Sequence, residues 1–381
     1  MTCQVGSFFP HWFNQVGLKM VFRFVFGLGS AVFALTVGAA PLDALLTATP
    51  EQIAPNGFVE LGTDHMNQRL DFLNIRESDP LTAGTKAGDY LGGHVSAAVR
   101  AGDGVWLSGS LWKRTISNAT DTFDYTSWQV AGLYRFMEAD GKRPALALRL
   151  STWGTRSAAT ESTAPVTVPG AILNTVKITE PADRQLQADL IGTWKLTSAT
   201  DVSALLSAGS SKLSYGALSA TTTRNLCNYQ LTFNGNDIFG TLAEPCSATG
   251  GVIQQFYDRS GDYGVDVASE IAWHGYFIQA GVNSAWRNGP WTLQGGYLFH
   301  VVRRNLVDDI LAARGKPVYT QNHGVTLQAD YRFNPHLSTF VRGQYSSNLF
   351  FSEIPVTYNS STSDRFSSRY TLFTLGLRAD F

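Results

Sequence analysis

The feature that most constrains what this chain can fold into is its final stretch, TLFTLGLRADF, residues 371–381. It alternates in strict two-residue steps, which is the side-chain period of a β-strand. One face is almost wholly apolar and carries Phe373, Leu375, Leu377, Ala379 and Phe381, whereas the other carries Leu372, Thr374, Gly376, Arg378 and Asp380. A chain terminus is ordinarily poorly ordered unless other structure holds it. We therefore expect this last strand to be paired within a sheet up to its final residue.

The composition indicates a chain rich in strand and turn formers and poor in ion pairs. Charged residues make up 15% of the 381 residues, aromatic residues make up 12%, and there are 36 glycines. Ordinary soluble domains contain about 25% charged residues. The formal net charge of -1 gives no broad attraction to a polyanion, so a nucleic-acid partner is not expected. Three widely spread cysteines are too few for a zinc module, and no motif predicts a metal or another cofactor.

Residues 1–40 have the order of a secretory signal. Lys19 and Arg23 precede the apolar run VFGLGSAVFALTV, residues 25–37, which small residues follow. We predict a signal peptide over residues 1–40, with Met20 as an alternative start. A membrane anchor is the other interpretation, but the apolar run is shorter than the roughly 20 residues that a spanning helix needs.

Beyond residue 41, the chain repeats pairs of alternating segments that are joined by very short turns and separated by longer polar loops. Asp-Gly, Asn-Gly and Asn-Pro, which favour tight turns, occur in RAGDGV, EADGKRP, RNGP and FNPH. The segments predict twelve strands, at 57–66, 90–100, 104–115, 126–137, 144–154, 184–197, 201–213, 266–286, 290–303, 323–333, 337–349 and 368–381. Fourteen strands is the alternative, because the segment 266–286 is long enough to hold an extra hairpin.

Two architectures produce this alternation, a soluble two-sheet sandwich and a barrel that spans a membrane. A sandwich places long loops at either end, whereas here the short turns lie on one side and the long loops on the other. Aromatic residues also gather on the apolar face near the short turns: Tyr134, Phe136, Trp194, Trp286, Trp291, Tyr331, Phe333 and Phe381. Amphipathic rings at one level suit a lipid interface. The sequence therefore predicts an all-β fold, an antiparallel transmembrane β-barrel with short periplasmic turns and long extracellular loops.

The end of the chain resembles that of Gram-negative outer-membrane barrel proteins, a porin-like class. These proteins commonly finish on a strand with a terminal Phe, a Gly five residues before it and a polar residue seven before it. Phe381, Gly376 and Thr374 match this assembly signal, whereas Ala379 departs from the large apolar residue usual at its position. The resemblance implies a bacterial outer-membrane location, contact with outer-membrane lipid and lipopolysaccharide, and recognition by the barrel-assembly machinery.

The same resemblance implies a domain organisation and a reason for the terminal strand. Residues 41–56 would be a periplasmic segment and residues 57–381 the barrel. A closed barrel pairs its last strand with its first, because an open edge in lipid leaves backbone groups without partners. The final strand is therefore expected to form the seam.

The predicted lumenal face carries charges at two levels. Each strand that descends to a short turn has a basic residue near that turn, which gives a ring of Arg100, Arg135, Lys195, Arg287, Arg332 and Arg378. Further lumenal charges are Glu60, Asp64, Arg149, Asp189, Asp330 and Arg342. Rings of Arg and Lys favour anions in a pore, so this pattern predicts a channel for small polar solutes, anionic ones included. Alternatively, the charges pair with one another and stiffen a closed barrel.

Two other functions stay open. Outer-membrane phospholipases use a His and a Ser two residues apart on a strand, as His94 and Ser96 are in GGHVSAAV. That pair faces lipid in those enzymes, whereas the alternation places His94 and Ser96 in the lumen, so catalysis is not expected. The second alternative is a surface-recognition or adhesion barrel with a closed lumen, which would use the long loops at 159–181 and 214–265.

The longest loop, residues 214–265, contains Cys227 and Cys246. In an oxidising compartment these cysteines form an even pair, which predicts a disulfide, with two free thiols as the alternative. A disulfide would reduce the unfolded-state entropy of the loop and help it to keep one shape. We expect this loop to cover the external mouth, to constrict it or to bind a ligand.

Overall fold

The structure of this chain is a computed structural model. It describes residues 45–46, 56–66, 89–117, 122–140, 142–162, 165–168, 171–246, 252–347, 355, 358 and 370–381. The predicted signal peptide and most of the segment 41–56 lie outside these residues. Within the part that is described, no helix is long and apolar enough to cross a membrane.

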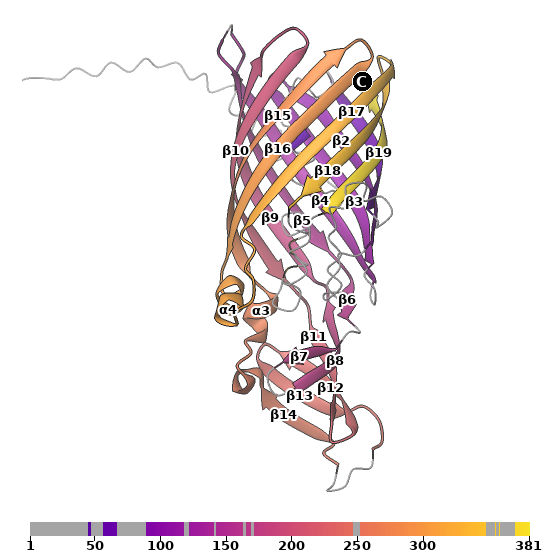
Figure 1. Cartoon of the computed structure of the whole chain (residues 1–381), viewed down its shortest axis with the longest axis vertical. Helices are drawn as coiled ribbons and strands as arrows, with labels where there is room; N and C mark the ends of the chain where they lie inside the picture. Colours follow the sequence, from indigo (N-terminus) through magenta and orange to yellow (C-terminus); the bar gives the residue numbers. More distant parts are fainter. Residues whose placement is uncertain are drawn as a thin grey trace, which may run out of the picture. The chain divides into compact units, whose positions relative to one another are not determined.

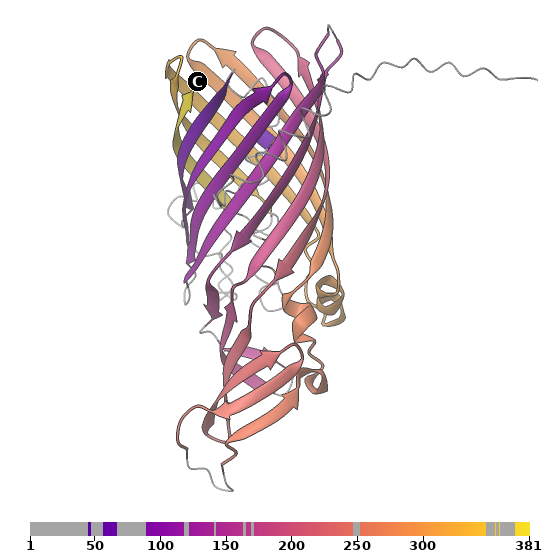
Figure 2. The same cartoon turned by 180° about the vertical axis from the view of Figure 1, so that it is seen from behind.

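Twelve antiparallel strands form a closed barrel, as the sequence predicts (Figures 1 and 2). Each strand of the barrel pairs with the next barrel strand along the chain. Two of these pairs, β5 with β9 and β10 with β15, have strands of a second sheet between them in the sequence. In chain order the barrel strands are β1 (Gly57–Met66), β2 (Asp89–Gly102), β3 (Val105–Ser117), β4 (Thr122–Met137), β5 (Ala145–Arg156), β9 (Ala182–Lys195), β10 (Thr200–Ser214), β15 (His274–Asn288), β16 (Trp291–Arg304), β17 (Gln321–Asn334), β18 (Leu337–Ser346) and β19 (Tyr370–Asp380).

The barrel closes where β19 pairs with β1. Their register begins with Phe58 opposite Asp380 and runs through seven further residue pairs. The Phe381 amide donates to the Gly57 carbonyl oxygen at 2.9 Å, so pairing continues to the last residue. The alternation at the end of the chain therefore belongs to the strand that forms the seam.

Two residues of the proposed assembly signal have structural roles at this seam. A Cβ at Gly376 would lie 2.2 Å from a ring atom of Phe340 and 2.6 Å from the Leu61 carbonyl oxygen, so the position requires glycine. The Thr374 hydroxyl donates to the Asp64 carboxylate at 2.6 Å inside the barrel. Recognition of Thr374, Gly376 and Phe381 by an assembly machinery stays a prediction.

The outer surface of the barrel is apolar along its strands. Leu186, Leu206 and Leu327 expose 62%, 58% and 63% of their surface, although such side chains are usually buried in a soluble protein. The aromatic residues predicted at the lipid interface lie on this outer face, among them Trp286 and Phe333. Inward positions on the same strands are mostly polar and buried. This polarity matches a barrel whose outer surface faces lipid.

A second antiparallel sheet is formed by residues between the barrel strands. Its strand order is β14-β13-β12-β11-β8-β6, and β7 also pairs with β8 (Figures 1 and 2). We call it the outer sheet. Its strands are β6 (Ala159–Ser162), β7 (Val166–Val168), β8 (Ala171–Thr179), β11 (Leu218–Arg224), β12 (Cys227–Asn234), β13 (Asp237–Leu242) and β14 (Gln255–Arg259). One face buries a cluster around Ala220, Cys227, Tyr229 and Leu231.

The outer sheet corrects two expectations from the sequence. Residues 159–181 and 214–265 were expected to be loops, but β8 pairs with β11 and unites both segments in one sheet. Their strands were missed because one face carries Thr, Asn and Gln, which resembles loop composition.

The strand expected at 266–286 begins only at His274, because a helix occupies residues 267–271.

Short helices lie beside the loop ends of β15 and β16. They are the 3-10 helix η4 (Ser260–Tyr263), α3 (Val267–Ile271) and α4 (Val307–Ala313). The Asp266 carboxylate caps α3 by accepting from the Ser269 amide at 3.3 Å. Arg314, just after α4, forms an ion pair with Glu270 of α3. The hydrogen bond to Glu270 raises the pKa of Arg314.

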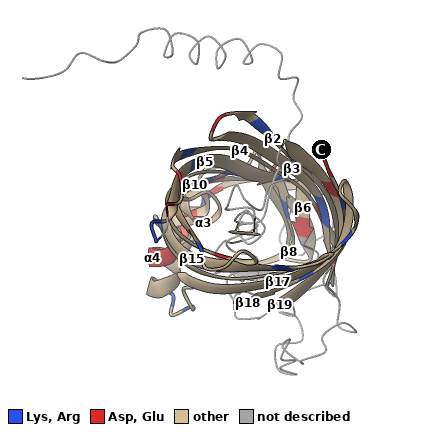
Figure 3. Ribbon diagram, turned by 90° about the horizontal axis from the view of Figure 1, so that it is seen from above, with Lys and Arg blue, Asp and Glu red and all other residues tan. Residues whose placement is uncertain are grey.

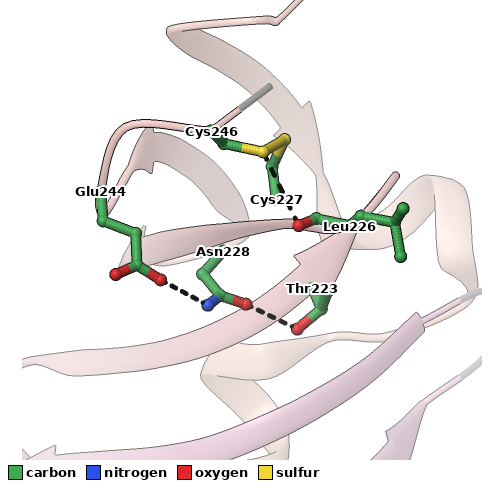
Figure 4. Close-up of a disulfide and its surroundings, with 6 residues drawn as sticks. All are labelled: Thr223, Leu226, Cys227, Asn228, Glu244 and Cys246. Carbon is green, nitrogen blue, oxygen red and sulfur yellow. Dashed lines mark hydrogen bonds between the residues drawn. A yellow bond between two sulfur atoms is a disulfide. The ribbon is translucent and has the colours of Figure 1, made fainter. Parts of the chain in front are cut away.

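The predicted disulfide between Cys227 and Cys246 is present, and the free-thiol alternative is wrong (Figure 4). It joins the start of β12 to the segment after β13, across a sequence separation of 19 residues. Next to it, Asn228 donates to Glu244 at 2.8 Å and accepts from Thr223 at 2.8 Å (Figure 4). The bridge therefore lies in a hydrogen-bonded corner of a folded sheet.

Candidate functional site in the barrel lumen

The candidate site is the barrel lumen, which the ring of strands encloses (Figure 3). Inward side chains form an apolar cluster near the short turns, a polar belt, and a second apolar cluster near the long loops. The turn-side cluster consists of Leu45, Phe58, Ala98, Trp106, Leu133, Ala147, Ile191, Leu205 and Leu298. The loop-side cluster consists of Tyr125, Trp153, Leu213, Trp273, Phe277, Val302, Val307, Leu311, Tyr358 and Leu372.

The turn-side cluster contains a residue that is not part of the wall. Leu45 precedes the first strand, yet its side chain is 1% exposed. The Asn283 side-chain amide donates to the Leu45 carbonyl oxygen. Gly296 leaves room for it, because a Cβ there would lie 2.7 Å from a Leu45 methyl carbon. A segment N-terminal to the barrel therefore contributes to closing this level.

The loop-side cluster has the same property. Tyr358 belongs to the connection between β18 and β19, and it is completely buried. The Trp273 indole donates to the Tyr358 carbonyl oxygen at 2.8 Å, and the Arg304 guanidinium lies 3.8 Å from the centroid of the Tyr358 ring. Asp308 of α4 accepts from Arg304 at 2.9 Å, which holds the guanidinium in place. A loop residue is therefore part of the upper closure.

One side of the polar belt is a network across four strands. Arg342 donates to Glu60 at 2.9 Å. The His94 ring nitrogens lie 3.3 Å from Glu60 and 3.1 Å from Asp64. Asp64 also accepts from Thr374 at 2.6 Å. The network links β1, β2, β18 and β19 and brings together three charged residues that the sequence placed in the lumen.

Charges elsewhere in the belt are also partnered. Arg149 donates to Asp189 at 2.5 Å, and Gln187 donates to the same carboxylate. Asp330 accepts from Gln328 at 2.8 Å. All six lumenal charges outside the predicted ring are buried, which fits the alternative that such charges pair and stiffen the barrel.

The predicted basic ring lies at the turn end, on inward-facing positions of its strands. Four of its members contact an acidic side chain: Arg100 with Asp103 at 3.0 Å, Arg135 with Glu138 at 2.8 Å, Arg287 with Asp201 at 2.6 Å, and Arg378 with Asp380 at 2.7 Å. Lys195 and Arg332 are exposed, and no ion pair involves either of them among the residues that the structure describes. Positive charge at this mouth is therefore partly compensated, and its role in ion selectivity stays a prediction.

His94 faces the lumen, which is the observation that bears on the phospholipase alternative. It is 6% exposed, and its ring lies 5.5 Å from that of Trp112. Ser96 points to the same side, whereas Val95 faces outward and is 36% exposed. The lipid-facing His–Ser arrangement of outer-membrane phospholipases is therefore not formed by this pair.

Sequence reasoning missed the residues that close the lumen. Leu45 lies in the expected periplasmic segment and Tyr358 in a polar loop, and neither has a local signal for burial. Gln185 and Gln187 have the same parity as Asp189, which the sequence placed in the lumen, and the structure shows all three facing inward. Their inward position was the signal that could have marked them as lining a site.

Comparisons with known proteins find distant structural similarity alone. No protein-family model matches the sequence, and no curated protein matches it significantly. Among solved structures, the translocator domain of the autotransporter NalP from Neisseria meningitidis is similar with a TM-score of 0.48 and 10% identity, over 95% of this chain and 98% of that chain. KdgM porin has a TM-score of 0.35 and 9% identity over 84% and 99% of the two chains. The CymD monoaromatic hydrocarbon channel has a TM-score of 0.39 and 12% identity over 92% and 94%. Similarities at this level do not tell what this chain does.

The class follows from the architecture. A closed antiparallel barrel with an apolar outer surface and aromatic residues near its short turns belongs in an outer membrane. This chain has the fold of an outer-membrane β-barrel protein. Its lumen, with a polar belt between two apolar clusters, is the part of the barrel in which function has to be sought.

Proposed function

We propose that this protein is a gated channel for small polar solutes, and that Leu45 and Tyr358 help to hold it closed. One observation carries the proposal: each apolar cluster in the lumen includes a buried residue from outside the barrel strands. Wall side chains alone would close a barrel permanently, since the strands are fixed by their hydrogen-bond ladders. Residues on connecting segments can leave without breaking that ladder.

The polar belt supports the choice of solute. A barrel that served only as a rigid support has no need of a polar interior, because apolar side chains fill a lumen without the cost of burying charge. Here the belt carries carboxylates, guanidinium groups and amides on β1, β5, β9, β17 and β18. When the clusters separate, these groups would line an aqueous path.

The charges at the turn end support only a weak ion preference. Local ion pairs compensate four of the six basic residues of the ring. Lys195 and Arg332 are the two ring members for which no ion pair occurs among the described residues. We therefore expect slight anion preference in a salt gradient. Neutralising Lys195 and Arg332 together would remove it.

Planar-bilayer conductance tests the proposal. The wild-type protein is compared with the double variant Leu45→Asp/Tyr358→Ala, which places a charge in the turn-side cluster and truncates a ring in the other. Because both changes destabilise only the closed state, we expect the open probability to rise by about tenfold or more. Leu226→Asp is the matched control, since Leu226 lies in the turn between β11 and β12 of the outer sheet and is 88% exposed.

Heat-modifiable gel mobility must first show that each variant forms a folded barrel. A folded double variant that conducts no better than wild type would contradict gating by these residues. If wild type and all variants are folded and electrically silent, the channel proposal fails. The surface-recognition alternative, which relies on the outer sheet, would then be preferred.

A further inference from the structure

We propose that the lumenal wall formed by β5, β9 and β10 carries a binding site for a neutral polyhydroxylated solute, such as a saccharide. The proposal rests on the proposed channel function and names the class of solute that the channel selects. The site, which we call the hydroxyl–amide patch, consists of Ser151, Trp153, Gln185, Gln187, Ser207 and Ser211.

The strand register brings these residues together. On β5 and β9, Ser151 lies opposite Gln187, and Trp153 lies opposite Gln185. On β9 and β10, Gln185 lies opposite Ser211. All point inward, since the intervening residues of these strands face outward. Six polar side chains from three neighbouring strands therefore share one area of the wall.

The patch stands out because its hydrogen-bonding capacity is unused. The hydroxyls of the three serines, the Trp153 indole nitrogen, the Gln185 amide nitrogen and the Gln187 amide oxygen are buried without a hydrogen-bond partner. Each of the six residues is more than nine-tenths buried. Buried polar groups are almost always hydrogen-bonded, because an unmade bond costs free energy.

Several hydroxyls elsewhere in the same lumen have partners. Ser127 and Thr155 share a hydrogen bond of 3.1 Å, and Thr193 and Ser203 share one of 3.0 Å. The Ser346 hydroxyl donates to Asn322 at 2.9 Å. Single unpartnered atoms also occur on β15, β16 and β17, at Asn283, Gln294 and Thr326. Six such atoms gather on the neighbouring strands β5, β9 and β10, and this concentration requires its own explanation.

The chemistry of the patch selects a neutral, hydroxyl-rich molecule. It offers donors at Trp153 and Gln185, an acceptor at Gln187, and serine hydroxyls that do both, which complements sugar hydroxyls. The adjacent charges, Arg149 and Asp189, are paired with each other at 2.5 Å and add no net charge.

An apolar surface lies next to these polar groups. The rings of Trp153 and Phe277 are 6.0 Å apart and inclined by 51°. Such rings present flat apolar faces against which the C–H face of a sugar can pack, as Trp and Tyr do where a site is partly apolar and partly polar. A small inorganic anion would not pack against the rings, and it is too small to bond to all of the serine hydroxyls.

The patch is also linked to the upper closure. Trp153 and Phe277 belong to the loop-side cluster, which includes Tyr358. Separation of that cluster would free the rings and expose the unpartnered groups at the same time. Solute binding therefore favours the open lumen, because the ligand gains hydrogen bonds that the closed state does not make.

The test compares two sets of serine variants in the Leu45→Asp/Tyr358→Ala background. Ser151→Ala/Ser207→Ala/Ser211→Ala removes the unpartnered hydroxyls, whereas Ser127→Ala/Ser203→Ala is the matched control and removes lumenal hydroxyls that have partners. The probes are maltose, its anionic counterpart maltobionate, and tetraethylene glycol, which has similar polarity but few hydroxyls. The readouts are block of potassium chloride current and the heat-modifiable unfolding temperature with each probe.

We expect saturable block by maltose, with an apparent Kd that rises about tenfold or more in the triple variant, as loss of one or more hydrogen bonds requires. Maltose should block the Ser127→Ala/Ser203→Ala control with the same apparent Kd as the Leu45→Asp/Tyr358→Ala background. The triple variant should also unfold at the same or a higher temperature without solute, because unpartnered buried groups are removed. A purely structural role predicts lower stability and no change in block.

Three results would each overturn the binding site while leaving the channel intact. They are block by tetraethylene glycol that equals block by maltose, block by maltobionate that is stronger than block by maltose, and block by maltose that is unchanged in the triple variant. If the protein never conducts, the unfolding temperature decides. Stabilisation by maltose that the triple variant loses supports the site without the channel. The absence of stabilisation then overturns the site together with the channel.

Discussion

Strands β9 and β12 have the same two-residue alternation with opposite polarity. In β9 of the barrel, polar residues such as Gln185 are buried and apolar ones such as Leu186 are exposed. In β12 of the outer sheet, Leu231 is buried and Gln230 is exposed. The period is a property of the strand, whereas its direction depends on the medium outside. Lipid accepts the apolar side chains of the barrel, and water accepts the polar side chains of the outer sheet.

The two regions also differ in how they hold charge. Arg149 and Asp189 form an ion pair inside the barrel, where their side chains are 6% and 0% exposed. Lys177 and Glu161 form a pair on the outer sheet at 3.3 Å, with side chains 47% and 49% exposed. Removing one partner of a buried pair leaves a charge without compensation, whereas an exposed charge is solvated by water.

The largest expected effect follows from that contrast. Arg149→Ala should lower the free energy of unfolding by about 3–5 kcal/mol, because Asp189 would remain buried and charged. Lys177→Ala is the matched change in the outer sheet and should alter stability by no more than about 1 kcal/mol. Urea unfolding in phospholipid vesicles measures both. Similar effects of the two changes would contradict the difference in burial.

A charge on the outer face tests the polarity of the alternation directly. Leu206→Arg should destabilise the barrel by about 2–4 kcal/mol, because the guanidinium would face the hydrocarbon region. Thr232→Arg makes the same addition on the exposed face of β12 and should change stability by no more than about 0.5 kcal/mol. Urea unfolding in vesicles again compares them, and equal tolerance would mean that Leu206 does not face lipid.

Removal of the disulfide tests whether the barrel depends on the outer sheet for its stability. Cys227→Ala/Cys246→Ala should destabilise the outer sheet by about 3 kcal/mol, as expected for a loop of this length. The barrel should keep its heat-modifiable mobility, because the bridge lies wholly within the outer sheet. Limited proteolysis should then cut residues 218–259 faster than in the wild type. Loss of barrel mobility in the same variant would show that the outer sheet stabilises the barrel.

Much of the barrel could be predicted because its signal is local. The alternation in residues 184–197 and 323–333 identified strands and their inward faces, and tight-turn dipeptides located the hairpins. The inward direction of Gln185, Asp189 and Arg342 follows from parity alone. The outer sheet was missed, since β8 and β11 are separated in the chain by two barrel strands and only their pairing reveals them.

The site itself could be predicted only in part. The sequence placed Glu60 and Arg342 in the lumen, but their contact spans 282 residues and depends on closure of the barrel. It placed basic residues at the turn end, but their acidic partners became visible only in the structure. Neither Leu45 nor Tyr358 has a neighbour in the sequence that indicates burial.

The sequence by itself therefore determined the strands of the barrel, the two faces of each of them, the lipid-facing surface and the disulfide. Each depends on residue period, on turn chemistry or on the pairing of two cysteines. The tertiary structure alone decided which charges pair, which segments close the lumen and which polar groups on β5, β9 and β10 stay without partners. The physical reason is that side-chain direction repeats every two residues along a strand, whereas contacts across a lumen join residues whose separation in the chain carries no period.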